Sequence, residues 1–287
     1  MENKKFNNLI SVIMFILSLV MLFPFFLMVM TSFKTMAEIQ SNTFTLFPKH
    51  FNFIHYIEAM SRGDWGRYFF NSFFVTSVTV VVSLIINSMS GYAFARLHFR
   101  GRDTLFVIAL IGMMVPHQVT MVPLFIILKN FPLVGGNDIL GQGGMGWVNS
   151  YMGMILPYIA GAFGVFLFRQ FYLNFPTSLD DAASIDGLNK FQTFMKIYVP
   201  LGKPIFATLA VFKATQTWSE YGWPLVITNS DNMKTVQLAL TMFKDESIVI
   251  WNQMMAATTL ITLPLILAFV FAQRYFVKGI ATTGMKG

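Results

Sequence analysis

Two ionisable residues interrupt an apolar stretch in the C-terminal half of the chain, Lys213 and Glu220. A charged side chain in a run that can cross a membrane is costly unless it faces a bundle interior or a watery cavity, so both are functional candidates. Seven residues on a helix make two turns, roughly 10 Å of rise, so the two share a face without being expected to touch. Trp218, Tyr221 and Trp223 surround Glu220. Aromatic faces beside hydrogen-bonding groups suit the apolar C–H faces and the hydroxyls of a sugar.

A second interpretation of this group stays open beside the first. Trp218 and Trp223 also fit an aromatic belt at the membrane interface, with Glu220 paired to a neighbouring subunit. Pro116, in the middle of another apolar run, frees a backbone carbonyl and marks either a bend that lines a pathway or a packed kink. The residues assigned to a candidate translocation path are Pro116, Lys213, Trp218, Glu220 and Tyr221.

A polar, amphipathic island at residues 179–204 separates two long apolar runs. Thr177 and Ser178 resemble a helix start, and Asp180 and Asp181 lie in the first turn, where the helix dipole favours acids. Gly187 is placed to end that helix. A short helix of this kind fits a groove on another protein as a rigid knob, and the alternative is an ordinary amphipathic connector. The apolar residues that would anchor it are Phe191, Phe194, Met195, Ile197 and Tyr198, before Pro200 and Pro204 break the pattern.

The composition excludes a soluble domain. Hydrophobic residues make up 55% of the chain, charged residues 11%, and the mean hydropathy is +0.60. Six apolar runs are long enough to cross a bilayer as helices: residues 9–30, 70–90, 105–128, 152–171, 205–227 and 254–275. The first run is too long for a signal peptide and has no cleavage site after it, so we expect a retained helix.

The distribution of charge predicts the orientation of these spans. With both termini inside, the inner segments carry twelve basic and five acidic residues, whereas the outer segments carry seven of each. Lys213 and Glu220 cancel within a span, so the whole net charge of +7 lies on the inner side. The basic balance therefore reports topology, and a nucleic-acid partner is unnecessary. The long outer segment 31–68 is expected to form short helices.

Several chemistries are excluded by what the sequence lacks. There is no cysteine, so the chain has no disulfide, thiolate metal site or thiol nucleophile. The four histidines are scattered, and no metal site is expected. No G-x-x-x-x-G-K-[ST] run occurs, so this chain does not hold ATP in a P-loop. No pairing of a nucleophile with a base suggests an enzyme.

The polar island carries a family resemblance. Asp181-Ala182-Ala183, Gly187, Ile197 and Pro200 fall at the spacing of the E-A-A-x3-G-x9-I-x-L-P loop of ABC importer permeases, with Asp181 in place of Glu and Val199 in place of Leu. Weaker matches cover most of the chain: residues 71–72 (NS), 91–96 (GYAFAR), 116–120 (PHQVT), 218–224 (WSEYGWP) and 273–279 (QRYFVKG). The chain resembles the permease subunits of binding-protein-dependent carbohydrate importers, in the branch of the smaller maltose permease subunit.

This resemblance implies an all-α integral membrane protein of type I importer architecture, with six transmembrane helices and both termini cytoplasmic. It implies an N-terminal helix and extracellular segment at 1–69, a permease domain at 70–280 with a coupling loop at 174–204, and a cytoplasmic tail at 281–287. In such importers this loop contacts the ATPase subunit. The residues assigned to that contact are Asp180, Asp181, Ala182, Ala183, Ile185, Asp186 and Gly187.

The resemblance also implies the partners. They are a second, homologous permease, a dimer of ATPase subunits that binds ATP and Mg, an extracellular solute-binding protein and a sugar, in the cytoplasmic membrane of a bacterium or archaeon. The chain itself is expected to hold no cofactor and to catalyse no reaction. Alternatives are a non-sugar cargo such as glycerol phosphate or an amino acid, and an ion-coupled secondary transporter in which Lys213 and Glu220 titrate.

Overall fold

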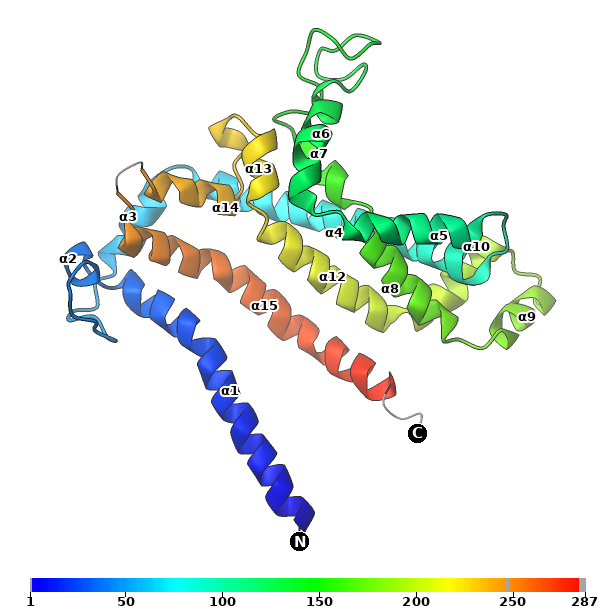
Figure 1. The fold of residues 1–287 in the computed structure, drawn as a ribbon, viewed down its shortest axis with the longest axis horizontal. Coiled ribbons are helices and arrows are strands. Elements are labelled where there is room, and N and C mark those ends of the chain that lie inside the picture. Colours follow the sequence, from blue (N-terminus) through cyan, green and yellow to red (C-terminus); the bar gives the residue numbers. More distant parts are fainter. Residues whose placement is uncertain (1, 246–247, 284–287) are drawn as a thin grey trace. The chain divides into compact units, whose positions relative to one another are not determined.

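The apolar runs fold into helices, and the computed structural model describes residues 2–245 and 248–283 of the 287-residue chain. Within these residues no strand is formed. Three helices contain single spans long and apolar enough to cross a membrane (Figure 1). They are α1 (Glu2–Ser32), α4 (Trp65–Arg96) and α15 (Trp251–Thr283), with candidate spans Phe6–Ser32, Trp65–Arg96 and Trp251–Phe271.

Three further spans are bent pairs of helices. Helix α5 (Arg102–Ile111) continues through a 3-10 turn, η1 (Gly112–Met114), and meets α6 (His117–Lys129) at 105°. Helices α7 (Tyr151–Ile155) and η2 (Leu156–Tyr158) meet α8 (Ala162–Leu173) at 43°. The segment made of α10 (Lys190–Thr193), a π-helical turn η3 (Phe194–Tyr198) and α11 (Val199–Leu201) meets α12 (Lys203–Trp218) at 77°. Counting each pair as one span gives the six predicted spans.

The fifth predicted span differs from the structure. Residues 205–227 were expected as one helix, but α12 ends at Trp218 and a separate helix, α13, covers Gly222–Ile227. The Glu220 carboxylate accepts a hydrogen bond from the Trp223 amide at 3.1 Å, which satisfies a free amide in the first turn of α13. Pro224 also lies in that turn, where its missing N–H costs nothing. A polar side chain therefore stabilises the start of the second helix inside an apolar run.

The chain divides into two compact units. The first combines Met1–Trp65 with Ala239–Pro264. In it the Ser32 and Tyr56 hydroxyls are 2.7 Å apart, and the indole of Trp65 donates to the Ala59 carbonyl at 2.9 Å and stacks on Phe243. The predicted outer segment contains the short helices α2 (Met36–Ile39) and α3 (Ile54–Ser61). The short helix η5 (Leu240–Phe243) also belongs to this unit, whereas η4 (Asp231–Met233) and α14 (Val236–Ala239), except for Ala239, belong to the second.

The second unit combines Gly66–Leu238 with Leu265–Gly287 and contains the three bent pairs. Two apolar clusters hold it together. The Trp223 cluster is Val75, Leu128, Val148, Met154, Ile155, Tyr158, Trp223, Ile227 and Met233. The Tyr198 cluster is Tyr92, Ala95, Phe168, Tyr172, Phe194, Tyr198, Ile205 and Leu209. In the same unit, the short helix α9 (Ser178–Ile185) follows α8 in the chain and lies at one end of the unit (Figure 1).

Helices α4 and α8 approach each other closely through small residues. A Cβ atom on Gly91 would lie 2.4 Å from the Cβ of Phe168, and one on Gly164 would lie 2.7 Å from the Asn87 side chain. The Asn87 side chain in turn accepts a hydrogen bond from the Gly161 amide at 3.2 Å. Small residues at helix crossings are what close packing in a membrane requires. These contacts hold α4 and α8 against each other.

Candidate functional site

Helix α9 has the start and the end that the sequence indicates. It begins at Ser178, with Asp180 and Asp181 in its first turn. At the other end Gly187 has a φ of +75°, and the amides of Gly187 and Leu188 donate to the carbonyls of Ser184 and Ala183 at 3.1 and 2.9 Å. This is the Schellman arrangement, which needs a left-handed residue after the helix. The predicted role of Gly187 as the terminating glycine is confirmed.

The base of α9 is tied to the second unit by one carboxylate. The Tyr198 hydroxyl donates to both oxygens of Asp180, at 3.0 and 2.9 Å, and the Arg96 guanidinium lies 3.4 Å from the same group. Arg96 also donates to the carbonyls of Tyr172 and Phe175 and lies over the ring of Tyr198. Its side chain is only 7% exposed. The C-terminus of α4, the end of α8 and the π-helical turn therefore meet at Asp180.

The residues assigned to the docking contact divide between two faces. Ala183 is 1% exposed, and Asp180 points to Arg96 and Tyr198. The opposite face is open to solvent: Ile185 is 86% exposed, and Asp181, Ala182, Asp186 and Gly187 are exposed as well. The inner face positions the helix, and the outer face presents an apolar side chain beside two carboxylates.

A cavity of about 390 Å³ lies where two helix breaks face α12. The polar side chains that line it are His117, Thr120, Tyr158, Lys213 and Gln216. The His117 ring is hydrogen-bonded to the Tyr158 hydroxyl at 3.1 Å. The Lys213 ammonium donates to the backbone carbonyl of Tyr158 at 3.3 Å, at the point where η2 ends. The broken spans thus bring polar groups together within an apolar unit, as lipid-sheltered irregular backbone does when it lines a cavity.

Of the five residues assigned to a translocation path, Lys213 alone is in the cavity lining, and Pro116 lies between the lining residues Val115 and His117. Glu220 follows the end of α12 and contacts the Tyr158 hydroxyl as well as the Trp223 amide. The other two lie elsewhere: Trp218 is 4% exposed and packs on the rings of Phe69 and Phe73, and Tyr221 precedes α13 and is 42% exposed.

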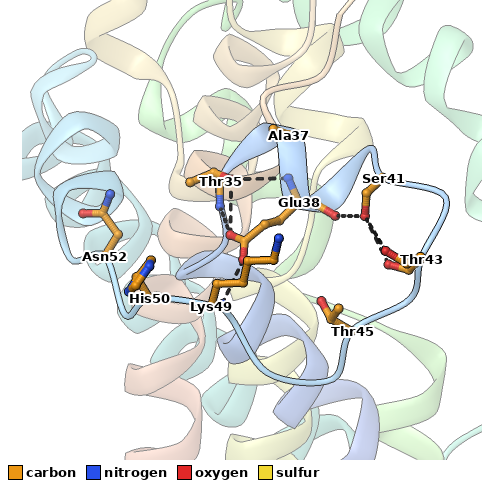
Figure 2. Close-up of a pocket in the computed structure, with 9 residues that line it drawn as sticks. All are labelled: Thr35, Ala37, Glu38, Ser41, Thr43, Thr45, Lys49, His50 and Asn52. Atoms are coloured by element: carbon orange, nitrogen blue, oxygen red, sulfur yellow. Dashed lines mark hydrogen bonds between the residues drawn. The ribbon is translucent and has the colours of Figure 1, made fainter.

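A second cavity, of about 410 Å³, lies in the predicted outer segment (Figure 2). The Glu38 carboxylate is part of its lining and accepts hydrogen bonds from the amides of Thr35 and Lys49, at 2.9 and 2.8 Å. These hydrogen bonds hold the pKa of Glu38 below its ordinary value, and the bond from the Thr35 amide has the largest effect. The remaining lining is mostly hydroxyl and amide groups, from Ser41, Thr43, Thr45 and Asn52. Among all the described residues, no three His, Asp or Glu side chains gather to hold a metal ion.

The segment after α13 is clamped to the start of α4. Asp231 accepts hydrogen bonds from the Tyr68 hydroxyl at 2.7 Å and from the Lys234 ammonium at 2.9 Å. The Asn71 amide donates to the carbonyls of Asn232 and Lys234, each at 2.8 Å. Both hydrogen bonds lower the pKa of Asp231, and the bond from Lys234 has the larger effect.

Residues 87–282, which include α9, the cavity and all three bent pairs, match the protein family described as the inner membrane component of binding-protein-dependent transport systems. The chain belongs to this family. It is a permease, a transport subunit of an ABC importer, and its place is in the cell membrane. The predicted resemblance is confirmed, and membership argues against an ion-coupled secondary transporter.

The permease has curated relatives that match nearly end to end. It is 34% identical to the arabinooligosaccharides transport system permease protein AraQ of Bacillus subtilis, over 94% of this chain and 92% of the relative. It is 32% identical to the lactose transport system permease protein LacG of Rhizobium radiobacter, over 90% and 89%. It is 31% identical to the sn-glycerol-3-phosphate transport system permease protein UgpE of Brucella abortus, over 98% and 99%.

The fold of the permease is also that of a solved importer. A chain of a bacterial ABC transporter involved in the import of the acidic polysaccharide alginate superposes with a TM-score of 0.77, at 23% identity, covering 96% of this chain and 98% of that one. The all-α importer-permease architecture predicted from the sequence is thereby confirmed. The cytoplasmic placement of the termini stays a prediction, and residues 284–287 of the predicted tail lie outside the described residues.

Sequence reasoning missed several residues that build these sites. Arg96 enters the sequence analysis only as an inner charge and as the last residue of the match at 91–96, although it lies at the end of an apolar run and is the residue that pairs with Asp180. His117 was set aside as one of four scattered histidines, and Tyr158 and Gln216 were not singled out. The signal that could have identified His117 is its place directly after Pro116, because a helix break at this proline exposes neighbouring side chains to a cavity.

Proposed function

We propose that this permease forms half of a translocation pore that imports a sugar or oligosaccharide, powered by ATP that a separate ATPase dimer hydrolyses. The observation that carries the proposal is the build of α9: an exposed outer face on a helix whose inner face is fixed to the second unit by Asp180 and Ala183. The resemblance to relatives named for arabinooligosaccharide and lactose transport supports the cargo class.

The contacts at the base of α9 suggest how movement of a docked partner reaches the pore. Asp180 binds Tyr198 in the π-helical turn, and this turn leads through α11 to α12. Tyr198 is fully buried in the Tyr198 cluster, so α9 and this turn move together. Helix α12 carries Lys213 into the cavity. A displacement of α9 is thus passed to a cavity-lining helix through packed side chains.

The proposed cycle is alternating access. ATP binding closes the ATPase dimer, shifts α9 and opens the pore toward the solute-binding protein, and hydrolysis resets it. Only a difference in how the ATP-bound and ATP-free partner hold α9 can shift this equilibrium. The second permease, the ATPase dimer with its ATP and Mg, and the solute-binding protein are the partners this cycle requires. The same requirement puts α9 and both termini on the cytoplasmic side.

A phosphorylated polyol is the second candidate cargo. The observation that favours it is the likeness to relatives named for sn-glycerol-3-phosphate transport, which extends over 98% of this chain. A sugar is favoured because two of the three relatives described above carry sugar or oligosaccharide names.

Photo-crosslinking tests the docking role of α9. With benzoylphenylalanine in place of Ile185, which is 86% exposed, the complete importer should yield an adduct between the permease and the ATPase subunit. Ile139 is the matched control, because it is an isoleucine of 75% exposure in a loop predicted to lie outside. An equal yield of ATPase adduct from both positions, or none from Ile185, contradicts the proposal.

Transport itself is tested in proteoliposomes that contain the complete importer. We expect uptake of labelled arabinotriose or lactose to require ATP and to continue after ionophores collapse the ion gradients. Uptake driven by an ion gradient without ATP would contradict the proposed energy source.

A further inference from the structure

The cavity between the broken helices contains a buried positive charge without a negative partner. Lys213 is only 6% exposed. Within the part of the chain that the structure describes, its ammonium makes one hydrogen bond, to the Tyr158 carbonyl at 3.3 Å. Among the described residues, no carboxylate forms an ion pair with it. One long neutral hydrogen bond does not compensate an ammonium taken out of water.

The nearby carboxylate does not supply the missing charge. Glu220 contacts the Tyr158 hydroxyl in η2 and accepts from the Trp223 amide in α13, and among the described residues it forms no ion pair with Lys213. His117, another titratable residue in the lining, is hydrogen-bonded to the same Tyr158 hydroxyl. Among the described residues, the Lys213 ammonium therefore has N–H donors that remain largely without acceptors.

The space around the ammonium suits an anionic group. A Cβ atom on Gly161 would lie 3.6 Å from the Lys213 nitrogen, so the absence of a side chain there leaves room beside the charge. Gln216, one turn along α12, and Thr120 add neutral polar groups to the lining. The volume of about 390 Å³ lies in the range typical of small-ligand sites.

We propose that Lys213 forms a subsite for an anionic oxygen group on the translocated solute, either the carboxylate of an acidic sugar or the phosphate of a polyol or sugar phosphate. This proposal rests on the proposed function, because it assigns a charge to the cargo of the same pore. An ammonium that keeps unused donors gains a charge-assisted hydrogen bond from such a group and gains much less from a neutral hydroxyl. The cavity therefore selects by charge among solutes of similar size.

Uptake of matched probes by the complete importer in proteoliposomes tests the proposal. The probes are digalacturonate, sn-glycerol 3-phosphate and a neutral galactose disaccharide, each measured for wild type, Lys213→Met, Lys213→Gln and Lys213→Arg. Loss of one charge-assisted hydrogen bond should slow uptake of the acidic probe at least about tenfold in the first two variants. Lys213→Arg should keep most of that uptake, and whichever acidic probe wild type carries identifies carboxylate or phosphate as the group.

Lys129→Met is the control, because Lys129 is an exposed lysine at the end of α6 and outside the cavity lining. It should leave the uptake of every probe unchanged. Co-purification of the second permease and the ATPase is measured for each variant.

The outcomes separate this proposal from the proposed function. If wild type imports only the neutral disaccharide, sugar import stands and the anionic subsite is refuted. If wild type imports none of the three with ATP but does import arabinotriose or lactose, sugar import also stands and the anionic subsite is refuted. If it imports none of these solutes with ATP, both proposals fail. If Lys213→Met and Lys213→Gln carry the acidic probe at the wild-type rate, Lys213 does not contact the cargo. If both lose the second permease while Lys213→Arg keeps it, the charge is paired with a carboxylate of that subunit, which also refutes the proposal.

Discussion

Replacing Asp180 with Asn should loosen α9 without unfolding the permease. The carboxylate accepts from the Tyr198 hydroxyl at 3.0 and 2.9 Å and lies 3.4 Å from the Arg96 guanidinium. Asn keeps one oxygen for Tyr198 and removes the charge. Arg96 retains the carbonyls of Tyr172 and Phe175, so it is not left without acceptors.

The size of the effect follows from these contacts. Hydrogen bonds to charged groups contribute about 1.5–3 kcal/mol, and exposed ion pairs contribute at most about 1 kcal/mol. The Asp180 side chain is 23% exposed and that of Arg96 is 7% exposed, which places the pair between these cases. With one hydrogen bond retained, the loss should be about 1–2 kcal/mol, a factor of about 5–30 in the local opening equilibrium.

Hydrogen exchange of the complete importer in nanodiscs measures this opening directly. The amides of Asp186 and Leu188 report on α9, because they donate to the carbonyls of Ala182 and Ala183, each at 2.9 Å. In Asp180→Asn they should exchange about 5–30 times faster, while the core of α4 is unchanged. Less solute should be transported for each ATP hydrolysed, since a loosened helix passes on less of its displacement.

Asp181→Asn is the matched control, with the same substitution one residue along on the exposed face of α9. It should leave the exchange of these amides unchanged. If Asp180→Asn exchanges no faster than Asp181→Asn, the Asp180 contacts do not hold α9. Tyr198→Phe should have a smaller effect in the Asp180→Asn background than in wild type, because the hydrogen bond that Asn retains is to a neutral acceptor and not to a carboxylate. Full additivity would also refute the reasoning.

Three further predictions concern single positions. Gly187→Trp should abolish transport but not membrane insertion, because the left-handed φ of +75° resists a side chain and the open space around it is assigned to the ATPase; wild-type uptake would count against docking. Glu220→Gln keeps the acceptor for the Trp223 amide, so it should change the rate of transport more than assembly, and loss of the purified complex would indicate a structural role. The clamp at Asp231, whose folded pKa lies below its ordinary value of 3.8, should keep its full strength above pH 3.8 and weaken as the pH falls through the folded pKa. Hydrogen exchange of residues 228–236, corrected for its intrinsic pH dependence, measures this loss. The loss of protection on acidification should be smaller in Tyr68→Phe, which lacks one of the two hydrogen bonds to Asp231. A loss of protection between pH 5 and 7 would contradict the assignment of this pH dependence to Asp231.

Much of the fold could be predicted because helix formation in lipid depends on local composition. A run of about twenty apolar residues satisfies its own backbone as a helix whatever surrounds it. The six spans were therefore visible in the chain. The breaks within them were not, because hydropathy averaged over a span stays high when the helix bends. Pro116 marked a break, but neither its angle of 105° nor the early end of α12 at Trp218 follows from proline or from apolarity alone.

The candidate site divides in the same way. Gly187 sets the C-terminal end of α9, and Asp180 and Asp181 favour its start through the helix dipole, since both effects act within a few residues of the chain. Their spacing was enough to indicate the family and the docking element. That Asp180 turns inward and Asp181 outward was decided by Arg96 and Tyr198, which no local rule connects to the loop.

By itself, therefore, the sequence determined which runs are apolar enough to cross a membrane, the family of the protein and the extent of α9, each a matter of residues close together in the chain. Only the tertiary structure decided which polar groups meet. Lys213 and Tyr158 are 55 positions apart, and they come together because α12 packs against a helix break. Packing between distant segments selects one face of each helix, and no periodicity within a single span specifies that choice.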